Sequence, residues 1–345
     1  MANLFFLLSG ENETLPFAEL KAILEAEGYA YSAEEKLDQL VRLKADLRSV
    51  NAVHRRSAYT MTSALELFTC PAQKNAVAQA ANNTDFRSAL SPGESFAVRI
   101  KRVKEYSEKS DTMNIERKLG KHILQNTVAT KVNLNTPDKT FFGVLTNDKL
   151  VFGMKLADIT PKTFSERRPR KKPFFHPSAM PSKLARCMVN LSRAKTGELV
   201  LDPFCGTGSV MIEASLVGCR VLGFDVQRRM AEGTRRNLKY FGVKPAGLVI
   251  ADSRKLPLKR IDRVVTDPPY GKSATTMKST TKQIVEGVLG SARVLLGEGQ
   301  LICIASPKTL NIARIGVKLG YRHVESHFAY VHRTLTREIA VFEKN

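Results

Sequence analysis

The sequence lacks tryptophan, contains only five cysteines among its 345 residues, and has no long uninterrupted apolar stretch. The cysteines are odd in number and include no C-x-x-C pair, which argues against a disulfide framework and against a tetrathiolate zinc site. Because no window of ~18 consecutive apolar residues is present, no membrane-spanning helix is expected. The apolar run in Met1–Gly10 has no basic leader, so it predicts a first strand and not a signal peptide.

Acidic residues are also scarce, with 33 Asp and Glu against 54 Lys and Arg, a formal net charge of +21. This excess favours a polyanionic partner, and we expect a soluble, cytoplasmic protein with neither a membrane nor a metal among its partners. Between Lys155 and Lys195, eleven basic residues accompany only two acidic ones. The run Arg167–Pro173 contains two prolines, which disfavour a helix and suit an extended linker. A domain boundary is expected there, and a chain lacking residues 1–157 is expected to fold by itself.

The hydrophobic patterns differ on the two sides of this linker. Before it, a strand at Leu4–Leu8, a helix near Pro16–Glu27 and a strand Ser95–Val103 with one basic face indicate an α+β half. After it, strands and helices alternate, which indicates a mainly parallel sheet and an α/β fold. The strands expected in that sheet are Leu199–Leu201, Val221–Phe224, Leu248–Ala251, Arg263–Thr266 and Leu301–Ala305, followed by a terminal hairpin of Val324–Val331 and Arg337–Phe342.

The first motif joins a strand to a helix and reads Asp202-Pro203-Phe204-Cys205-Gly206-Thr207-Gly208. Its glycines lack the Cβ atoms that would keep a ligand from the backbone, and the following helix offers free N–H donors. By itself a G-x-G loop is equally typical of a tight strand–helix turn. However, Asp225 ends the next strand, and Asp252 with Ser253 ends the third. Three successive strands that end in acids at one sheet edge predict a ligand site there.

The second motif is Asp267-Pro268-Pro269-Tyr270-Gly271, directly after the strand Arg263–Thr266. Methylation of an exocyclic amino group requires acceptors for its N–H bonds, because its lone pair is delocalised into the ring. The Asp267 carboxylate and the Pro268 carbonyl are such acceptors, and prolines stiffen the loop that presents them. Tyr270 offers a flat surface on which an extruded base can stack, worth ~1–3 kcal/mol. A plain proline turn is the alternative explanation of this motif.

Together these motifs resemble class I S-adenosylmethionine-dependent amino methyltransferases. Residues Phe175–Arg186 are similar to the lead-in of tRNA guanine-N2 methyltransferases, and Pro92–Leu156 resembles a THUMP domain, a small α/β RNA-binding module. The whole layout resembles the archaeal-type family that modifies guanosine 10 of tRNA. The resemblance implies a small α+β domain at residues 1–58, a THUMP domain at 59–157, a basic linker at 158–174 and a Rossmann-like methyltransferase domain at 175–345.

The same resemblance implies a role for each motif residue. Asp267, Pro268, Pro269 and Tyr270 would be catalytic, with the first two orienting guanine N2 and the last stacking on the ring. Asp225 would bind the ribose hydroxyls of S-adenosylmethionine, and Asp252 with Ser253 the adenine amino group. The remaining cofactor contacts would come from Asp202, Pro203, Phe204, Gly206, Thr207, Gly208 and His176. One or two methyl groups would be added to N2.

The implied partner is tRNA, and a small activator protein is a further candidate partner. Phosphate contacts are expected from basic residues on the strand Ser95–Val103, on a helix near Asn114–Asn126 and in the linker. These residues are Arg99, Lys101, Arg102, Lys104, Arg117, Lys118, Lys121, Arg167, Arg168, Arg170, Lys171 and Lys172.

Several alternatives stay open on the sequence. The enzyme could methylate N2 of guanine at another tRNA position or in rRNA, or an amino group in DNA, and a non-catalytic RNA-binding protein with this fold is the alternative of another class. Cys205 could supply a thiolate for cytosine-C5 methylation, although a packing role is the better interpretation. His323, His327 and His332 have loose metal-like spacing but no matching acids or thiols, so strand or surface positions are expected.

Overall fold

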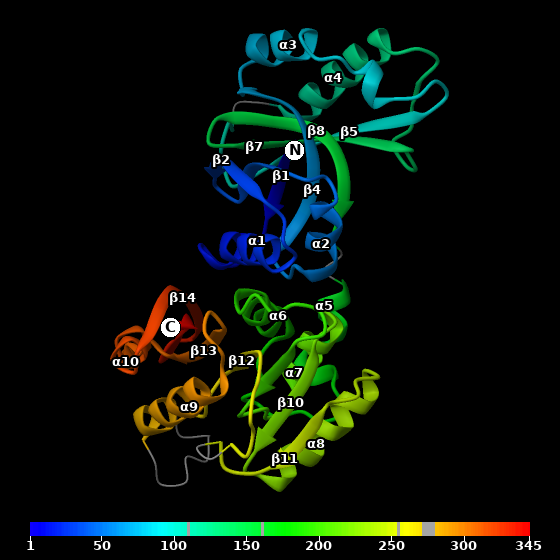
Figure 1. The fold of residues 1–345 in the computed structure, drawn as a ribbon. Coiled ribbons are helices and arrows are strands. Elements are labelled where there is room, and N and C mark those ends of the chain that lie inside the picture. The colour runs from blue at the N-terminus through cyan, green and yellow to red at the C-terminus, as the bar shows by residue number, and fades with distance from the viewer. Residues whose placement is uncertain (109–110, 160–161, 254–255, 271–279) are drawn as a thin grey trace. The chain divides into compact units, whose positions relative to one another are not determined.

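The computed structural model describes residues 1–108, 111–159, 162–253, 256–270 and 280–345. Gly271 of the second motif and residues 160–161 of the expected linker therefore lie outside the described residues. The chain forms two compact units, both visible in Figure 1. Unit 1 contains residues 1–11, 29–54 and 60–159, and unit 2 contains residues 12–28, 55–59 and 160–345. The finer division at residues 58, 157 and 174 stays a prediction.

Unit 1 is built on one eight-stranded mixed sheet of order β2-β3-β1-β4-β8-β7-β5-β6. The first expected strand is β1, and β5 matches the expected basic-faced strand. Strand β1 pairs antiparallel with β4, so residues from both sides of the expected boundary at residue 58 share this sheet. The strands are β1 (Ala2–Leu8), β2 (Tyr31–Leu37), β3 (Leu40–Ala45), β4 (Thr60–Pro71), β5 (Ser95–Arg102), β6 (Lys131–Val132), β7 (Lys139–Thr146) and β8 (Lys149–Asp158).

Two helices of unit 1, α3 (Lys74–Asn82) and α4 (Thr112–Asn126), pack against this sheet through apolar side chains. Leu119 and Ile123 of α4 share a buried cluster with Phe96 and Phe141, so the apolar stripe of the helix faces the apolar face of β5 and β7. Unit 1 also contains the 3-10 turn η1 (Arg87–Ala89) and most of α2 (Ser49–Arg56), whose last two residues belong to unit 2.

Unit 2 contains a seven-stranded sheet of order β11-β10-β9-β12-β13-β15-β14, which confirms the expected α/β fold with its terminal hairpin. The first five strands are parallel, and β15 runs antiparallel to β13. The chain order reverses at β9, and ligands of such sheets bind at the carboxyl ends of the strands beside that reversal. The strands are β9 (Leu199–Asp202), β10 (Arg220–Asp225), β11 (Gly247–Ile250), β12 (Arg263–Thr266), β13 (Leu301–Pro307), β14 (Tyr321–His332) and β15 (Leu335–Lys344).

Helices cover both faces of this sheet, because alternate side chains of its buried strands point to opposite faces. Val200 belongs to the cluster with α6, α7 and α8, whereas Leu201 belongs to the cluster with α9 and α10 (Figure 1). Strands buried on both faces carry nearly continuous apolar runs, which is why the sequence indicated them so clearly. The helices are α6 (Ser182–Leu191), α7 (Ser209–Leu216), α8 (Arg228–Tyr240), α9 (Thr281–Leu295) and α10 (Ile312–Lys318), with η3 at Lys308–Leu310.

The helix expected near Pro16–Glu27 forms as α1 (Leu15–Ala26), but it belongs to unit 2. Glu19 of α1 is fully buried, and its carboxylate accepts hydrogen bonds from Ser57 Oγ at 2.7 Å, Tyr59 N at 2.9 Å and Asn190 Nδ2 at 2.9 Å. Burial raises the pKa of Glu19, and these hydrogen bonds oppose that rise. A buried carboxylate is tolerated because its lone pairs are occupied, so α1 and residues 55–59 are held to α6.

This packing argues against the expectation that a chain lacking residues 1–157 folds by itself, which stays untested. Such a chain would lose α1 and its partners, expose the apolar surface under Leu15 and Ala22, and leave Asn190 without the acceptor of its amide. We expect no cooperative thermal transition for this truncated chain when circular dichroism follows unfolding. A sharp transition near that of the full chain would contradict the assignment of α1 to unit 2.

The proline-containing stretch after residue 161 also differs from the expected extended linker. It contains α5 (Lys162–Glu166) and the 3-10 turn η2 (Pro169–Lys171). Pro169 starts the turn, where its missing N–H costs nothing. No helix among the described residues is long and apolar enough to cross a membrane.

Candidate active site

A cavity of about 390 Å³ opens at the carboxyl ends of the parallel strands of unit 2. It brings together both motifs, although they are separated by more than 50 positions in the sequence. Gly208 does not line the cavity; it caps the start of α7. The other expected cofactor and catalytic residues all line it, namely His176, Asp202, Pro203, Phe204, Gly206, Thr207, Asp225, Asp252, Ser253, Asp267, Pro268, Pro269 and Tyr270.

The loop between β9 and α7 requires glycine at two positions. Gly206 and Gly208 have φ values of 52° and 79°, in the left-handed region that side chains with a Cβ disfavour. A Cβ atom on Gly208 would also lie 3.0 Å from Thr234 Cγ2. Helix α8 holds this loop, because Thr234 Oγ1 donates to the Gly206 carbonyl at 2.6 Å and Asn237 Nδ2 donates to the Thr207 carbonyl at 2.9 Å.

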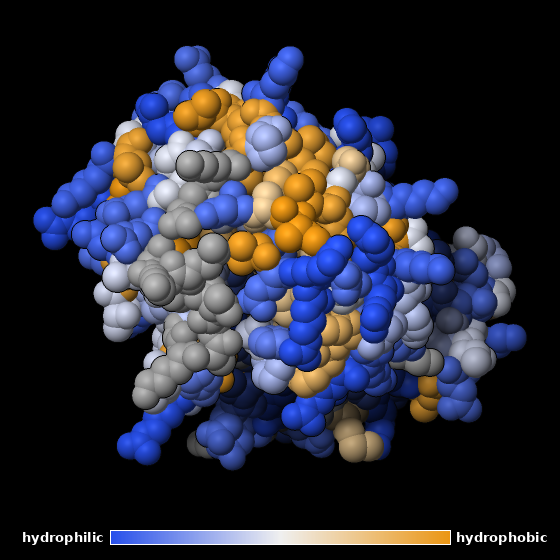
Figure 2. Space-filling view, turned by 90° about the horizontal axis from the view of Figure 1, so that it is seen from below, coloured by the Kyte–Doolittle hydropathy of each residue, from blue (hydrophilic) through white to orange (hydrophobic). Residues whose placement is uncertain are grey.

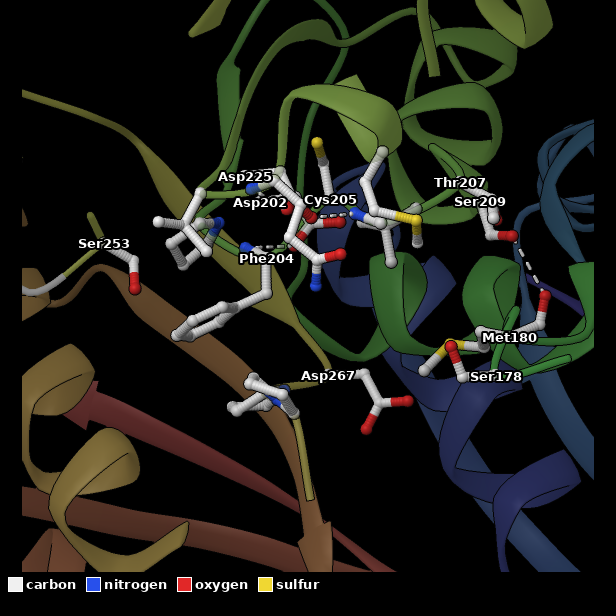
Figure 3. A pocket seen from close by; sticks show the side chains of 18 of the residues that line it. Ser178, Met180, Asp202, Phe204, Cys205, Thr207, Ser209, Asp225, Ser253 and Asp267 are labelled. Atoms are coloured by element: carbon white, nitrogen blue, oxygen red, sulfur yellow. Dashed lines mark hydrogen bonds between the residues drawn. The ribbon is translucent and has the colours of Figure 1, made fainter. Parts of the chain in front are cut away.

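Two of the acids are built into the wall of the cavity. Asp202 is 3% exposed, and its Oδ1 accepts from Thr266 Oγ1 at 2.8 Å. Asp225 accepts from the backbone N–H groups of Gly206 at 3.0 Å and Gln227 at 2.9 Å. Figure 3 shows Asp202 and Asp225 beside one another, with the Phe204 ring extending toward Ser253. Their carboxylates therefore make the cavity negative in a chain that is otherwise strongly positive.

Burial, with a smaller contribution from the nearby charges of Asp267 and Asp225, raises the pKa of Asp202 to about 7, against the opposing hydrogen bond of Thr266. The folded protein therefore binds a proton below pH 7 that the unfolded chain binds only near 3.8.

It follows that the free protein should become more stable as the pH falls from 8 to 5. Asp202→Asn should be more stable than wild type at pH 8, by about 1–4 kcal/mol, and should lack that part of the pH dependence. Thermal unfolding of both proteins at pH 5 and pH 8 measures this. Equal pH dependence in the two proteins would show that Asp202 is ionised throughout.

The turn after β12 carries another acid of the cavity wall. Asp267 Oδ2 lies 2.9 Å from Nη2 of Arg337, which β15 contributes, and Arg337 Nε donates to the Tyr270 hydroxyl. The other oxygen, Oδ1, is buried and accepts no hydrogen bond from any described residue. Burial raises the pKa of Asp267, whereas Arg337 and the Tyr270 hydroxyl lower it. In Figure 3, Asp267 is drawn below the Asp202 and Asp225 pair, and its charge is one of those that raise the pKa of Asp202.

Sequence reasoning missed Arg337. It lies on β15 in the same alternation as Ile339 and Val341, and all three are buried. A charge that shares the register of buried apolar residues requires a partner inside the fold, and this signal was available from the sequence. The sequence did not indicate that this partner is Asp267, which lies 70 positions earlier in the chain.

The chain is similar to proteins of known function. It matches the family described as "RMKL-like, methyltransferase domain" over residues 169–337, and one described as "DNA methylase" over residues 73–236, a stretch that ends before Asp267. It is 38% identical over 340 residues to the tRNA (guanine(10)-N2)-dimethyltransferase of Methanothermobacter thermautotrophicus, covering 98% of each chain. The chain belongs to the tRNA (guanine(10)-N2)-dimethyltransferase family.

Other members and a solved structure extend this result. The dimethyltransferase of Methanocaldococcus jannaschii is 30% identical, over 98% of this chain and 99% of that one. The crystal structure of TrmN from Thermus thermophilus has a TM-score of 0.55 at 19% identity and covers 99% of this chain and all of that chain. At this identity the likeness concerns the fold alone, and it supports the Rossmann-like methyltransferase fold expected for this family.

The basic residues of this chain that are expected to contact tRNA are in different environments. Arg168, Arg170 and Lys171 are exposed on unit 2, and on unit 1 so are Lys101, Lys104, Arg117, Lys118 and Lys121. Lys104 is also paired with Asp38 at 2.6 Å. Arg99 and Arg102 are half-buried and donate to the carbonyls of Leu134 and Glu108.

The structure contradicts the expectation that Lys172 contacts a phosphate of tRNA. It is 6% exposed, its ammonium donates to Ser209 Oγ at 2.8 Å, and burial lowers its pKa to about 8. A side chain packed in this way cannot also reach a phosphate on the surface. Arg167 is likewise largely committed, because its Nε lies 2.8 Å from Glu213 Oε1 and its side chain is only 12% exposed.

The structure also shows the environments of the cysteine and histidines that were considered as alternative catalytic or metal-binding residues. Cys205 is buried, and burial raises its pKa well above the ordinary value, which disfavours a thiolate and agrees with a packing role. His323, His327 and His332 all lie on β14, as expected. His327 contacts Glu325 at 3.1 Å, and among the described residues no group of three potential ligands is placed to hold a metal.

Proposed function

We infer that the protein transfers methyl groups from S-adenosylmethionine to the exocyclic N2 of guanosine 10 in tRNA, giving the mono- and dimethylated nucleoside. The inference depends most on one observation, the similarity to the dimethyltransferase of Methanothermobacter thermautotrophicus along nearly the whole of both chains. The cavity in unit 2 supports it independently, because its chemistry suits a cationic cofactor and an amino acceptor.

The charge of the cavity fits S-adenosylmethionine. Burial, together with the charges of Asp267 and Asp225, raises the pKa of Asp202, so a cationic ligand would stabilise the ionised carboxylates, and this cofactor carries both an ammonium and a sulfonium group. Asp225 would bind the ribose hydroxyls, and Asp252 with Ser253 would bind the adenine amino group. The loop containing Phe204 and Gly206 would surround the methionine part. When bound, the cofactor supplies an electrophilic methyl group attached to sulfur.

The turn after β12 would handle the acceptor. Guanine N2 has two N–H bonds, and Asp267 Oδ1 together with the Pro268 carbonyl can accept them, which turns the nitrogen lone pair toward the methyl donor. The N–H becomes acidic as the N–C bond forms, so Asp267 can take the proton. The first product retains one N–H bond, and the same carboxylate can serve the second transfer. Tyr270 would stack on the guanine ring.

The exposed basic residues would bind the tRNA backbone. Figure 2 shows a face of the molecule on which long hydrophilic side chains lie around a hydrophobic area. A net charge of +21 favours tRNA binding through counterion release. A cytoplasmic location is proposed with it, because tRNA is the substrate.

Salt dependence tests these contacts. Replacing Arg168, Arg170 and Lys171 together with alanine should weaken tRNA binding and flatten the plot of log affinity against log salt by roughly 1 for each phosphate that is no longer neutralised. S-adenosylmethionine affinity should stay unchanged. The control is the exposed triple on α8, Arg235, Arg236 and Lys239, which should keep the wild-type slope. If both triples change the slope equally, the charge effect is not local to η2.

The function itself is tested with labelled S-adenosylmethionine and four substrates. These are a tRNA transcript with guanosine 10, the same transcript with adenosine 10, an rRNA fragment and duplex DNA. We expect incorporation only into the first, and nucleoside analysis should give methyl- and dimethylguanosine. The purified chain alone also reports whether an activator protein is required. Equal incorporation into the adenosine-10 transcript would reject position 10, and incorporation into DNA alone would favour the amino methyltransferase alternative.

A further inference from the structure

Arg337 lines the cavity, and neither motif assigns it a role. Its side chain is 9% exposed and comes from β15, which is separated from β12 by β13 in the sheet order. From there its guanidinium contacts two groups of the acceptor turn. Nη2 lies 2.9 Å from Asp267 Oδ2, and Nε donates to the Tyr270 hydroxyl. Arg337 therefore joins the terminal hairpin to the turn that would hold the base.

The contacts divide the functions of Asp267 between its two oxygens. Oδ2 is held by Arg337, whereas Oδ1 is buried without a hydrogen-bond donor among the described residues. A buried acceptor without a donor costs free energy, so a site that retains one is suited to a donor that arrives with a ligand. The amino group of the acceptor base is such a donor.

We propose that Arg337 is a positioning residue for methyl transfer, which fixes Asp267 and Tyr270 so that Asp267 Oδ1 and the Tyr270 ring meet the acceptor base. The proposal rests on the proposed function, in which Asp267 accepts the N–H bonds of guanine N2. A planar guanidinium can hold two groups at once through separate N–H bonds, whereas a lysine ammonium is a single point charge.

Arg337 also acts on the ionisation of Asp267. Among the described residues, the titratable groups that face Asp267 are Arg337 on β15, Tyr270 in the same turn and Asp202 on β9. Burial raises the pKa of Asp267, and Arg337 is the largest influence that lowers it. Only the carboxylate can take the proton from N2, so removal of Arg337 should move the acid limb of the pH–rate profile to higher pH.

The test uses the full chain under single-turnover conditions with a guanosine-10 transcript. Arg337→Met should lower the transfer rate by ~100-fold, because a small misplacement of the reacting groups is enough for such a loss. Its acid limb should move to higher pH, and its affinity for S-adenosylmethionine should stay near wild type. Arg337→Lys should restore the acid limb but only part of the rate. Arg322→Met, at the other end of the same hairpin, is the control and should behave as wild type.

A double-variant cycle separates positioning from a general structural role. In an Asp267→Asn background, Arg337→Met should lower the rate by less than about threefold, because the group through which it acts is already changed. A full additional loss there, or an Arg337→Met rate and acid limb equal to wild type, would overturn the proposal. If Arg337→Met no longer binds S-adenosylmethionine, the same criteria apply to Arg337→Lys. Wild-type protein that transfers no methyl to any tRNA would instead refute the proposed function.

Discussion

Asp267→Ala should abolish nearly all methyl transfer while leaving cofactor binding almost intact. Removing a positioned proton acceptor typically lowers a rate by ~10²–10⁴-fold, and here the same carboxylate also orients the amino group. The loss should fall on the transfer step, because Asp267 lies in the turn after β12 that would hold the base, whereas the ribose of the cofactor is assigned to Asp225 at the end of β10. Single-turnover kinetics and calorimetry with S-adenosylmethionine measure the two effects separately.

Asp267→Asn is the matched variant, because it keeps the shape and removes the charge. It should be nearly as inactive as the alanine variant, since an amide oxygen can accept an N–H bond but cannot take the proton. Either variant with more than about half the wild-type rate would remove Asp267 from the mechanism, since losses of ~10²-fold or more are expected for such a group. A loss of cofactor affinity equal to the loss of rate would place Asp267 among the cofactor contacts instead.

Asp225→Ala should have the largest effect on the cofactor. The ribose diol would lose a charged acceptor worth about 1.5–3 kcal/mol, which is roughly a tenfold to 100-fold weaker affinity. The structure adds a second reason, because the Asp225 carboxylate accepts the backbone N–H of Gly206 at 3.0 Å. Its removal therefore also releases the glycine loop that would surround the methionine part. The dissociation constant from calorimetry is the measurement.

The control for this substitution is Glu232→Ala. Glu232 lies on α8, the helix that follows β10, and its side chain is 54% exposed and outside the cavity. Glu232→Ala removes one negative charge from the same region of unit 2 and leaves the glycine loop unchanged, so cofactor affinity should not change. Unchanged affinity in Asp225→Ala would mean that the ribose is bound elsewhere. An equal loss in both variants would indicate a long-range charge effect.

The sequence was sufficient to predict the features that depend on residues close to one another in the chain. Strand–helix alternation indicated the parallel sheet, because strands buried on both faces must be apolar along their length. The glycines at 206 and 208 were recognisable because positive φ excludes most other residues. Asp202, Asp225 and Asp267 could be placed together from their positions in the chain, because the first two end strands, the third directly follows one, and the carboxyl ends of parallel strands share one edge.

Only the tertiary structure decided which residues meet across long distances in the chain. The sequence does not indicate that α1 packs against α6. The apolar stripe of a helix shows which face is buried but not which element covers it. Lys172 is in a basic run that favours a solvated surface, yet its ammonium is buried on Ser209. In the sequence, Arg337 is a single charge in an apolar strand. Only the strand order of the sheet shows that it pairs with Asp267. Local composition fixes which residue types a segment can bury, whereas the pairing of those residues depends on the free energy of the whole packed core.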